Sequence, residues 1–169
     1  MRTARITSRY DVAHAWAQQS TKKSGSAGNV SFHGPSYLSY ATEVARFHTS
    51  KKSRAVLFTS RRYSVTTSCH VQAAQSAVCG LDVQTFTVPN VDPRSANDHN
   101  WNWRHYMDQI RENAGKAKRT TKYKDIYLVA AREYIEKANA YAKFFGLRKS
   151  LPSDLDEIER MARKVGLIN

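Results

Sequence analysis

Cations interleaved with aromatic and hydroxyl side chains are the residues of this 169-residue sequence best suited to a chemical task. Residues 61–64 read Arg-Arg-Tyr-Ser, and residues 116–124 contain five cations and no acid. Guanidinium and ammonium groups bind phosphates, and an aromatic ring can stack on a nucleic-acid base. Both segments therefore predict contact with nucleic acid. A solvated loop that keeps a hairpin from aggregating, and a charged linker, are the alternatives.

The overall charge supports this interpretation. The formal net charge is +13, and residues 1–62 contain eleven lysines and arginines against two acids. Residues 94–150 contain thirteen against six. So large an excess of positive charge destabilises the folded chain, because like charges repel one another. It therefore favours a polyanionic partner that would neutralise the charge. The candidate nucleic-acid-binding residues are Arg2, Arg5, Arg9, Lys51, Lys52, Arg54, Arg61, Arg62, Tyr63, Lys116, Lys118, Arg119, Lys122 and Lys124.

The N-terminal arm and two tryptophans add further candidates. The arm, with Arg2, Arg5 and Arg9, can enter a minor groove or can simply be a frayed terminus. Trp101 and Trp103 stand two residues apart and cannot share one face of a helix. One of them is therefore expected to be exposed for contact with a partner, with packing at the helix end as the alternative.

Patterns typical of enzymes are missing from the sequence. None of the six histidines pairs with another ligand at a recognised metal spacing, and the first ninety residues contain only Asp11, Glu43 and Asp82 as acids. The sequence has no phosphate-binding glycine-rich loop and no serine elbow. We therefore expect a non-enzymatic protein without metal or cofactor. Cys69 and Cys79 are expected to be reduced thiols in the cytoplasm of the host cell, because no signal-peptide or membrane pattern is present.

The first part of the chain alternates between helical and strand periodicity. Asp11 is expected to cap a helix over 11–19, followed by a polar loop over 20–28. Ser68 is expected to cap an inserted helix over 69–79. The predicted strands cover residues 29–33, 37–47 with a break near 41–42, 55–59, 63–67 and 83–88. Short connections between them favour an antiparallel meander.

The last part of the sequence is helical. One helix is expected from His99 to Asn113, with Gly115 as its stop and residues 116–124 as a basic connector. A second runs from Asp125 to Phe145 with a tyrosine every seven residues, most simply a core stripe. A third is expected from Ser153 to about Val165. The whole pattern is α+β, with a mixed domain over 1–92 and a bundle of about three helices over 93–169 packed on it.

Several segments resemble a small family of uncharacterised proteins carried by phages and plasmids. They are Val12–Ser20, Gly28–Phe32, Tyr37–Tyr40, Ala45–Phe47 and Tyr63–Ser68, with His70 shortly after. Leu38 departs from the pattern, because an aromatic residue is expected there. The resemblance implies an origin in a mobile element and carries no activity with it. The motif residues Asn29, Ser39, Thr66, Thr67 and His70 are expected to form a polar set, structural or facing a ligand.

Together these features predict an accessory protein of a phage or mobile element that binds nucleic acid or a nucleoprotein complex through a basic surface. One alternative is an inhibitor of a host defence nuclease, similar in action to an anti-CRISPR protein. Another is a structural or packaging protein of the virion. No helix-turn-helix, ribbon or zinc-finger signature is present, so modest sequence selectivity is expected.

Overall fold

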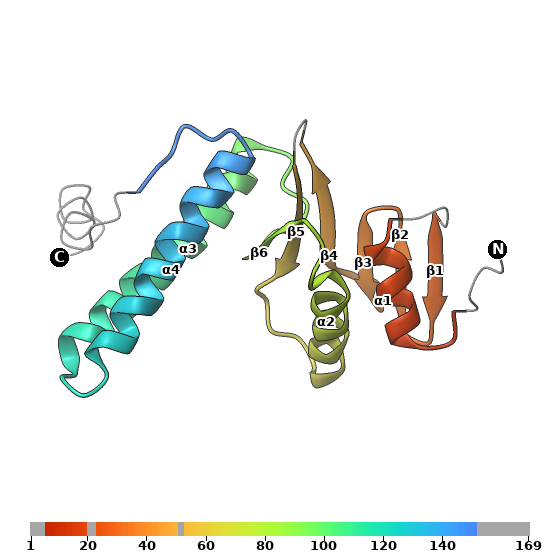
Figure 1. Ribbon diagram of the computed structural model, residues 1–169, viewed down its shortest axis with the longest axis horizontal. Coiled ribbons are helices and arrows are strands. Elements are labelled where there is room, and N and C mark those ends of the chain that lie inside the picture. Colours follow the sequence, from red (N-terminus) through yellow and green to blue (C-terminus); the bar gives the residue numbers. More distant parts are fainter. Residues whose placement is uncertain (1–5, 20–22, 51–52, 152–169) are drawn as a thin grey trace. The chain divides into compact units, whose positions relative to one another are not determined.

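A computed structural model describes residues 6–19, 23–50 and 53–151 of the chain (Figure 1). The chain divides into two compact units, Met1–Arg94 and Ser95–Asn169. The division falls two residues after the boundary expected from the sequence. The first unit combines a sheet with two helices and the second is helical, so the predicted α+β class is confirmed.

The first unit is built on a six-stranded sheet in which every strand lies beside its neighbour in sequence. Five strands form an antiparallel meander, and the sixth pairs in parallel with the fifth after a helical crossover. The strands are β1 (Ser24–Ala27), β2 (Val30–His33), β3 (Ser36–Ser39), β4 (Thr42–Thr49), β5 (Arg54–Thr59) and β6 (Gln84–Val88). The crossover is α2 (Val65–Val78), and α1 (Arg9–Ala17) precedes the sheet.

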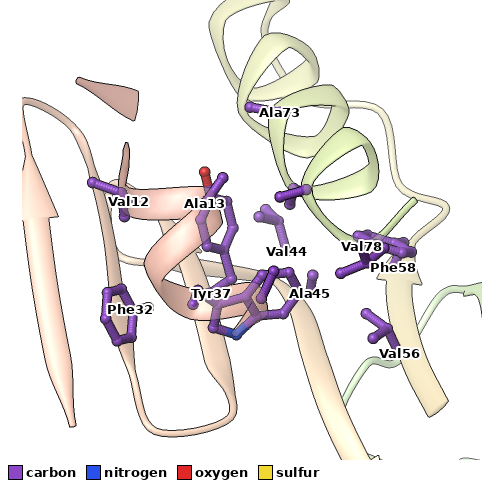
Figure 2. Close-up of a cluster of buried hydrophobic side chains, with 14 of the residues drawn as sticks. Val12, Ala13, Phe32, Tyr37, Val44, Ala45, Val56, Phe58, Ala73 and Val78 are labelled. Carbon is purple, nitrogen blue, oxygen red and sulfur yellow. The ribbon is translucent and has the colours of Figure 1, made fainter. Parts of the chain in front are cut away.

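The core of this unit lies between the sheet and its two helices (Figure 2). Val12 and Trp16 of α1 are fully buried against alternate residues of the strands, among them Tyr37 and Phe47. The Trp16 ring centroid is 5.0 Å from that of Tyr37 and 4.7 Å from that of Phe47. Its indole N–H donates to the carbonyl oxygen of Pro35 over 2.8 Å. The single indole therefore joins the helix to two strands and to a turn.

The strand predicted over residues 63–67 is wrong, because helix α2 begins there. The Ser64 side chain accepts a hydrogen bond from the backbone N–H of Thr67, so Ser64 and not Ser68 is the N-cap. The run Val65-Thr66-Thr67 resembles a strand by propensity alone. The helical spacing of buried Thr67, His70 and Ala74 decides the outcome instead. Residues 55–59 and 63–67 consequently form no hairpin, and the parallel neighbour of β5 is β6.

Two smaller expectations for the first unit also fail. The loop expected over 20–28 contains strand β1, whose small polar residues gave no strand signal. Gly25 leaves room there for two side chains, since a Cβ atom would lie 2.5 Å from Ile6 and 2.7 Å from Phe32 and would force them to shift. The cap of α1 is Ser8, and Asp11 is the third helical residue of a capping box.

Asp11 gives the protein an acid-sensitive helix end. The backbone N–H and then the hydroxyl of Thr7, followed by the groups of Ser8, lower the pKa of Asp11 to about 2. An unfolded aspartate titrates near pH ~3.9, so this stabilisation is complete above that value and is lost as the pH falls through about 2. We expect Asp11→Asn to be less stable than the wild type at pH ~5, and the difference to shrink toward pH ~2. Urea unfolding across this range checks the prediction, and a difference independent of pH would contradict it.

The second unit is a helical hairpin. Helix α3 (Ala96–Arg119) begins with a capping box of Ser95 and Asp98, and α4 (Lys124–Phe144) packs along it. Figure 1 shows the turn that joins them at the end of the hairpin opposite the start of α3. Tyr141 is fully buried, and its hydroxyl oxygen lies 2.9 Å from Asn102 Nδ2 and 2.9 Å from His99 Nδ1. This tyrosine belongs to the core, whereas Tyr127 and Tyr134 of the same stripe are half-buried.

The end of the first helix is also wrong in the sequence prediction. Helix α3 continues through Gly115 to Arg119, so Lys116, Lys118 and Arg119 belong to its last turn rather than to a connector. A Cβ atom at Gly115 would meet nothing within 4 Å. Gly115 lowers the stability of the helix but does not end it. The cations of the last turn stabilise the helix, because positive charge is favourable at a helix C-terminus. The third helix, expected from Ser153 to Val165, lies outside the described residues.

Candidate nucleic-acid interface

The densest group of cations lies at the turn between α3 and α4. We call it the hairpin-turn cluster, and its members are Lys116, Lys118, Arg119, Lys122 and Lys124. The last turn of α3 contributes three of them, the connecting residues one, and the first residue of α4 the fifth. All are exposed except Lys116, which is half-buried. The short connection brings the C-terminal end of one helix and the N-terminal start of the other together.

Contacts inside the cluster combine charge with aromatic rings. Lys116 Nζ donates to Glu112 Oε1 over 2.6 Å, and this hydrogen bond raises the pKa of Lys116. The same nitrogen is 5.8 Å from the Tyr127 ring centroid. Lys122 Nζ is 5.2 Å from the ring centroid of Tyr123, which is 47% exposed. An exposed ring held beside a cation can stack on a base while the cation meets a phosphate.

The N-terminus of α4 differs from those of the other three helices. Serine side chains cap α1, α2 and α3, whereas Tyr123 precedes α4 without any side-chain cap bond. The first N–H groups of a helix have no partner within the helix and carry partial positive charge. They add anion-binding donors to the cations of the hairpin-turn cluster. Asp125, in the first turn, is the acid closest in sequence to this end.

The candidate nucleic-acid-binding residues of the first unit lie in separate places and do not form one cluster. Arg61, Arg62 and Tyr63 lie exposed in the loop from β5 to α2. Arg54 is exposed at the opposite end of β5, about 20 Å away for a strand of this length. Arg9 is exposed on α1, and its Nη2 donates to the Tyr10 hydroxyl over 3.0 Å. The candidates Arg2, Arg5, Lys51 and Lys52 lie outside the described residues.

The two tryptophans of α3 separate as their spacing requires. Trp103 is buried, and Lys149 Nζ lies 5.6 Å from its ring centroid. Trp101 is 44% exposed. Trp103 therefore packs within the second unit, and Trp101 is the tryptophan of the pair whose side chain is accessible to a partner.

A buried polar cluster in the first unit joins Ser39, Thr67 and His70, three of the five residues expected to form a polar set, with Ser64. None of the four was among the candidate binding residues. The Ser39 hydroxyl donates to Thr67 Oγ1 over 3.2 Å and lies 2.8 Å from His70 Nδ1. The Ser64 and Thr67 hydroxyl oxygens are 3.2 Å apart. Ser39 ends β3 and the other three belong to the start of α2. The sheet register and the α2 packing, which sequence spacing does not reveal, bring the motif segments together.

His70 is held in its neutral form by its surroundings. Burial lowers its pKa first, and the positive charge of Arg9 lowers it further. The ring of Tyr40 and the hydroxyls of the cluster lie beside it, and no carboxylate is among the described groups that shift its pKa.

This environment predicts a specific titration. The unfolded histidine binds a proton near pH ~6.5 and the folded one only below that value, so stability falls as the pH drops below about 6.5. An NMR titration of the His70 ring is expected to give a midpoint under 6.5. Arg9→Gln should move that midpoint upward, because a positive charge is removed. A midpoint at or above 6.5 in the wild type would contradict this account.

Comparison with protein-family models, curated proteins and solved structures finds no match for the chain. Among the described residues, no helix has the length and apolar character needed to cross a membrane. The described residues also contain no group of three or more histidine, cysteine or acidic side chains placed to hold a metal ion.

Proposed function

We propose that this protein binds nucleic acid, alone or within a nucleoprotein complex, and that it does so without catalysis. The observation that carries the proposal is the hairpin-turn cluster, where five cations lie at the end of α3, in the connection and at the start of α4, whose N-terminus has no side-chain cap and follows the exposed ring of Tyr123. Lysine and arginine contacts to phosphates supply most of the affinity in such binding and little of the sequence selectivity.

The loop Arg61–Tyr63 is a second region for phosphate contact on the first unit. Its two guanidinium groups are exposed directly before the N-terminus of α2, whose first turn contains no acid. Its two arginines and the four cluster cations other than Lys116, which pairs with Glu112, provide six cations for phosphates. In this proposal the protein is an accessory factor of a phage or mobile element that acts on a nucleic acid in the host cytoplasm.

The salt dependence of binding tests this proposal. If six phosphates of a duplex are neutralised, the slope of log affinity against log salt is expected to be about −5. Fluorescence anisotropy with a short DNA duplex and with a single-stranded RNA measures this slope directly. A slope near zero for both would refute the proposal.

Exposed apolar residues favour a protein partner as a second candidate. Ile126 and Val129 are 64% and 52% exposed on α4, close in sequence to the hairpin-turn cluster. An inhibitor of a host nuclease complex would use such side chains as anchors beside its basic residues. Nuclease treatment of a lysate before affinity capture separates the candidates: loss of partners supports nucleic acid, and retention supports a protein target.

A further inference from the structure

His70 has an arrangement that packing alone does not require. The residue is 5% exposed, and Nδ1 is fixed by Ser39. Among the described residues, the second ring nitrogen, Nε2, has no hydrogen-bond partner, and it is not among the fully buried unpaired atoms. The ring is therefore almost entirely enclosed, while Nε2 keeps some contact with the surface.

The protons of the cluster determine what this nitrogen can do. Ser39 has one hydroxyl proton and donates it to Thr67 Oγ1. In this arrangement Nδ1 carries the proton and donates it to Ser39 Oγ over 2.8 Å. Neutral His70 consequently has a lone pair on Nε2, where it can accept a hydrogen bond from a ligand N–H or O–H.

Tyr40 provides an aromatic surface beside this nitrogen. Its ring centroid lies 6.2 Å from that of His70, and the residue is 53% exposed. Tyr40 also has a positive φ of 55°, an unfavourable conformation for a bulky side chain. Its backbone N–H donates to the Asn29 carbonyl oxygen over 2.6 Å, which holds the turn in place. Strained bulky residues of this kind cluster at ligand sites.

Arg9 adds a cation to the same region. The charge of its exposed guanidinium acts on Tyr37, Cys69 and His70, and its Nη2 donates to the Tyr10 hydroxyl over 3.0 Å. A hydrogen-bond acceptor, an aromatic ring and a guanidinium are the groups that recognise the base or sugar, the base plane and the phosphate of a nucleotide.

We infer that His70, Tyr40 and Arg9 form a site for a single nucleotide on the first unit. The base stacks on Tyr40, a base N–H or sugar hydroxyl donates to His70 Nε2, and the phosphate meets Arg9. Ser39 and Thr67 are positioning residues that hold the histidine tautomer. The inference rests on the proposed function in its choice of a nucleotide as ligand, but it places the contact on the first unit rather than on the hairpin-turn cluster.

NMR spectroscopy of the full chain tests the site with the four nucleoside monophosphates, ribose 5-phosphate and inorganic phosphate as separate probes. We expect at least one nucleotide to shift the His70 Nε2 and Tyr40 ring resonances in a saturable manner, and inorganic phosphate to leave both unchanged. If none of the four nucleotides moves these resonances, the inference is overturned. Equal effects of nucleotide and ribose 5-phosphate would also overturn it, since base stacking would then be absent.

Variants separate this site from the hairpin-turn cluster. Tyr40→Gly removes the ring while keeping the positive φ, and is expected to weaken nucleotide binding about tenfold. His70→Ala should have a similar effect, with exposed His33→Ala as the matched control. The salt slope for a duplex reports on the proposed function independently. Nucleotide shifts without a salt-dependent duplex affinity would refute that function and leave the site standing, and the reverse pattern would refute the site alone.

Discussion

Trp16→Ala is expected to destabilise the first unit by about 4 kcal/mol, the largest stability effect of any single substitution considered for this protein. The indole is completely buried, and it contacts the rings of Tyr37, Phe47 and Phe58. Truncation leaves a cavity at the centre of the core and removes the hydrogen bond to the Pro35 carbonyl oxygen. Urea unfolding of the full chain measures the loss, which is comparable with the total stability of many domains.

A second variant separates packing from hydrogen bonding. Trp16→Phe keeps an aromatic ring but has no N–H group, so the Pro35 carbonyl loses its donor. We expect Trp16→Phe to lower the free energy of unfolding by about 1 to 3 kcal/mol, because the carbonyl is left unpaired and the ring is smaller. If Trp16→Ala lowered the free energy of unfolding by less than Trp16→Phe does, the core would not depend on α1 as described.

Removal of four charges from the hairpin-turn cluster is expected to weaken nucleic-acid binding about a hundredfold or more at low salt. The variant replaces Lys118, Arg119, Lys122 and Lys124 with glutamine. Two of the six proposed phosphate contacts would remain, so the salt slope should fall from about −5 to about −2. Each of the four side chains is exposed, and the helices are expected to stay folded.

The matched control removes four charges elsewhere on the same unit. Arg132, Lys137, Lys143 and Arg148 are exposed on α4 and shortly after it, away from the turn. Their replacement by glutamine changes the net charge equally. If affinity depended only on total charge, both variants would weaken binding alike, and the hairpin-turn cluster would lose its special role.

Helices and strands with strong local patterns follow directly from the sequence. The strongly periodic segment of α4 begins and ends within one residue of its expected bounds, and strand β6 is found where alternation and Pro89 place it. The failures have local causes. Val65-Thr66-Thr67 has strand propensity but is capped by Ser64, and Ser24–Ala27 becomes a strand only because β2 offers it a partner.

The candidate sites divide in the same way. A run of cations such as residues 116–124 is visible in any sequence, and only its placement on two helix ends needs a structure. The contact between Ser39 and His70 spans 31 residues and depends on how α2 packs on β3. The free edge of a buried histidine also depends on hydrogen-bond partners, which spacing cannot supply. Only the motif segments hinted that these residues act together.

The most direct measurement maps a bound DNA duplex on the full chain by backbone amide NMR. We predict that the largest shifts fall on residues 116–124, with smaller ones on Arg61–Tyr63, and that raised salt reverses both. A bound duplex that left residues 116–124 unperturbed would contradict the proposed interface.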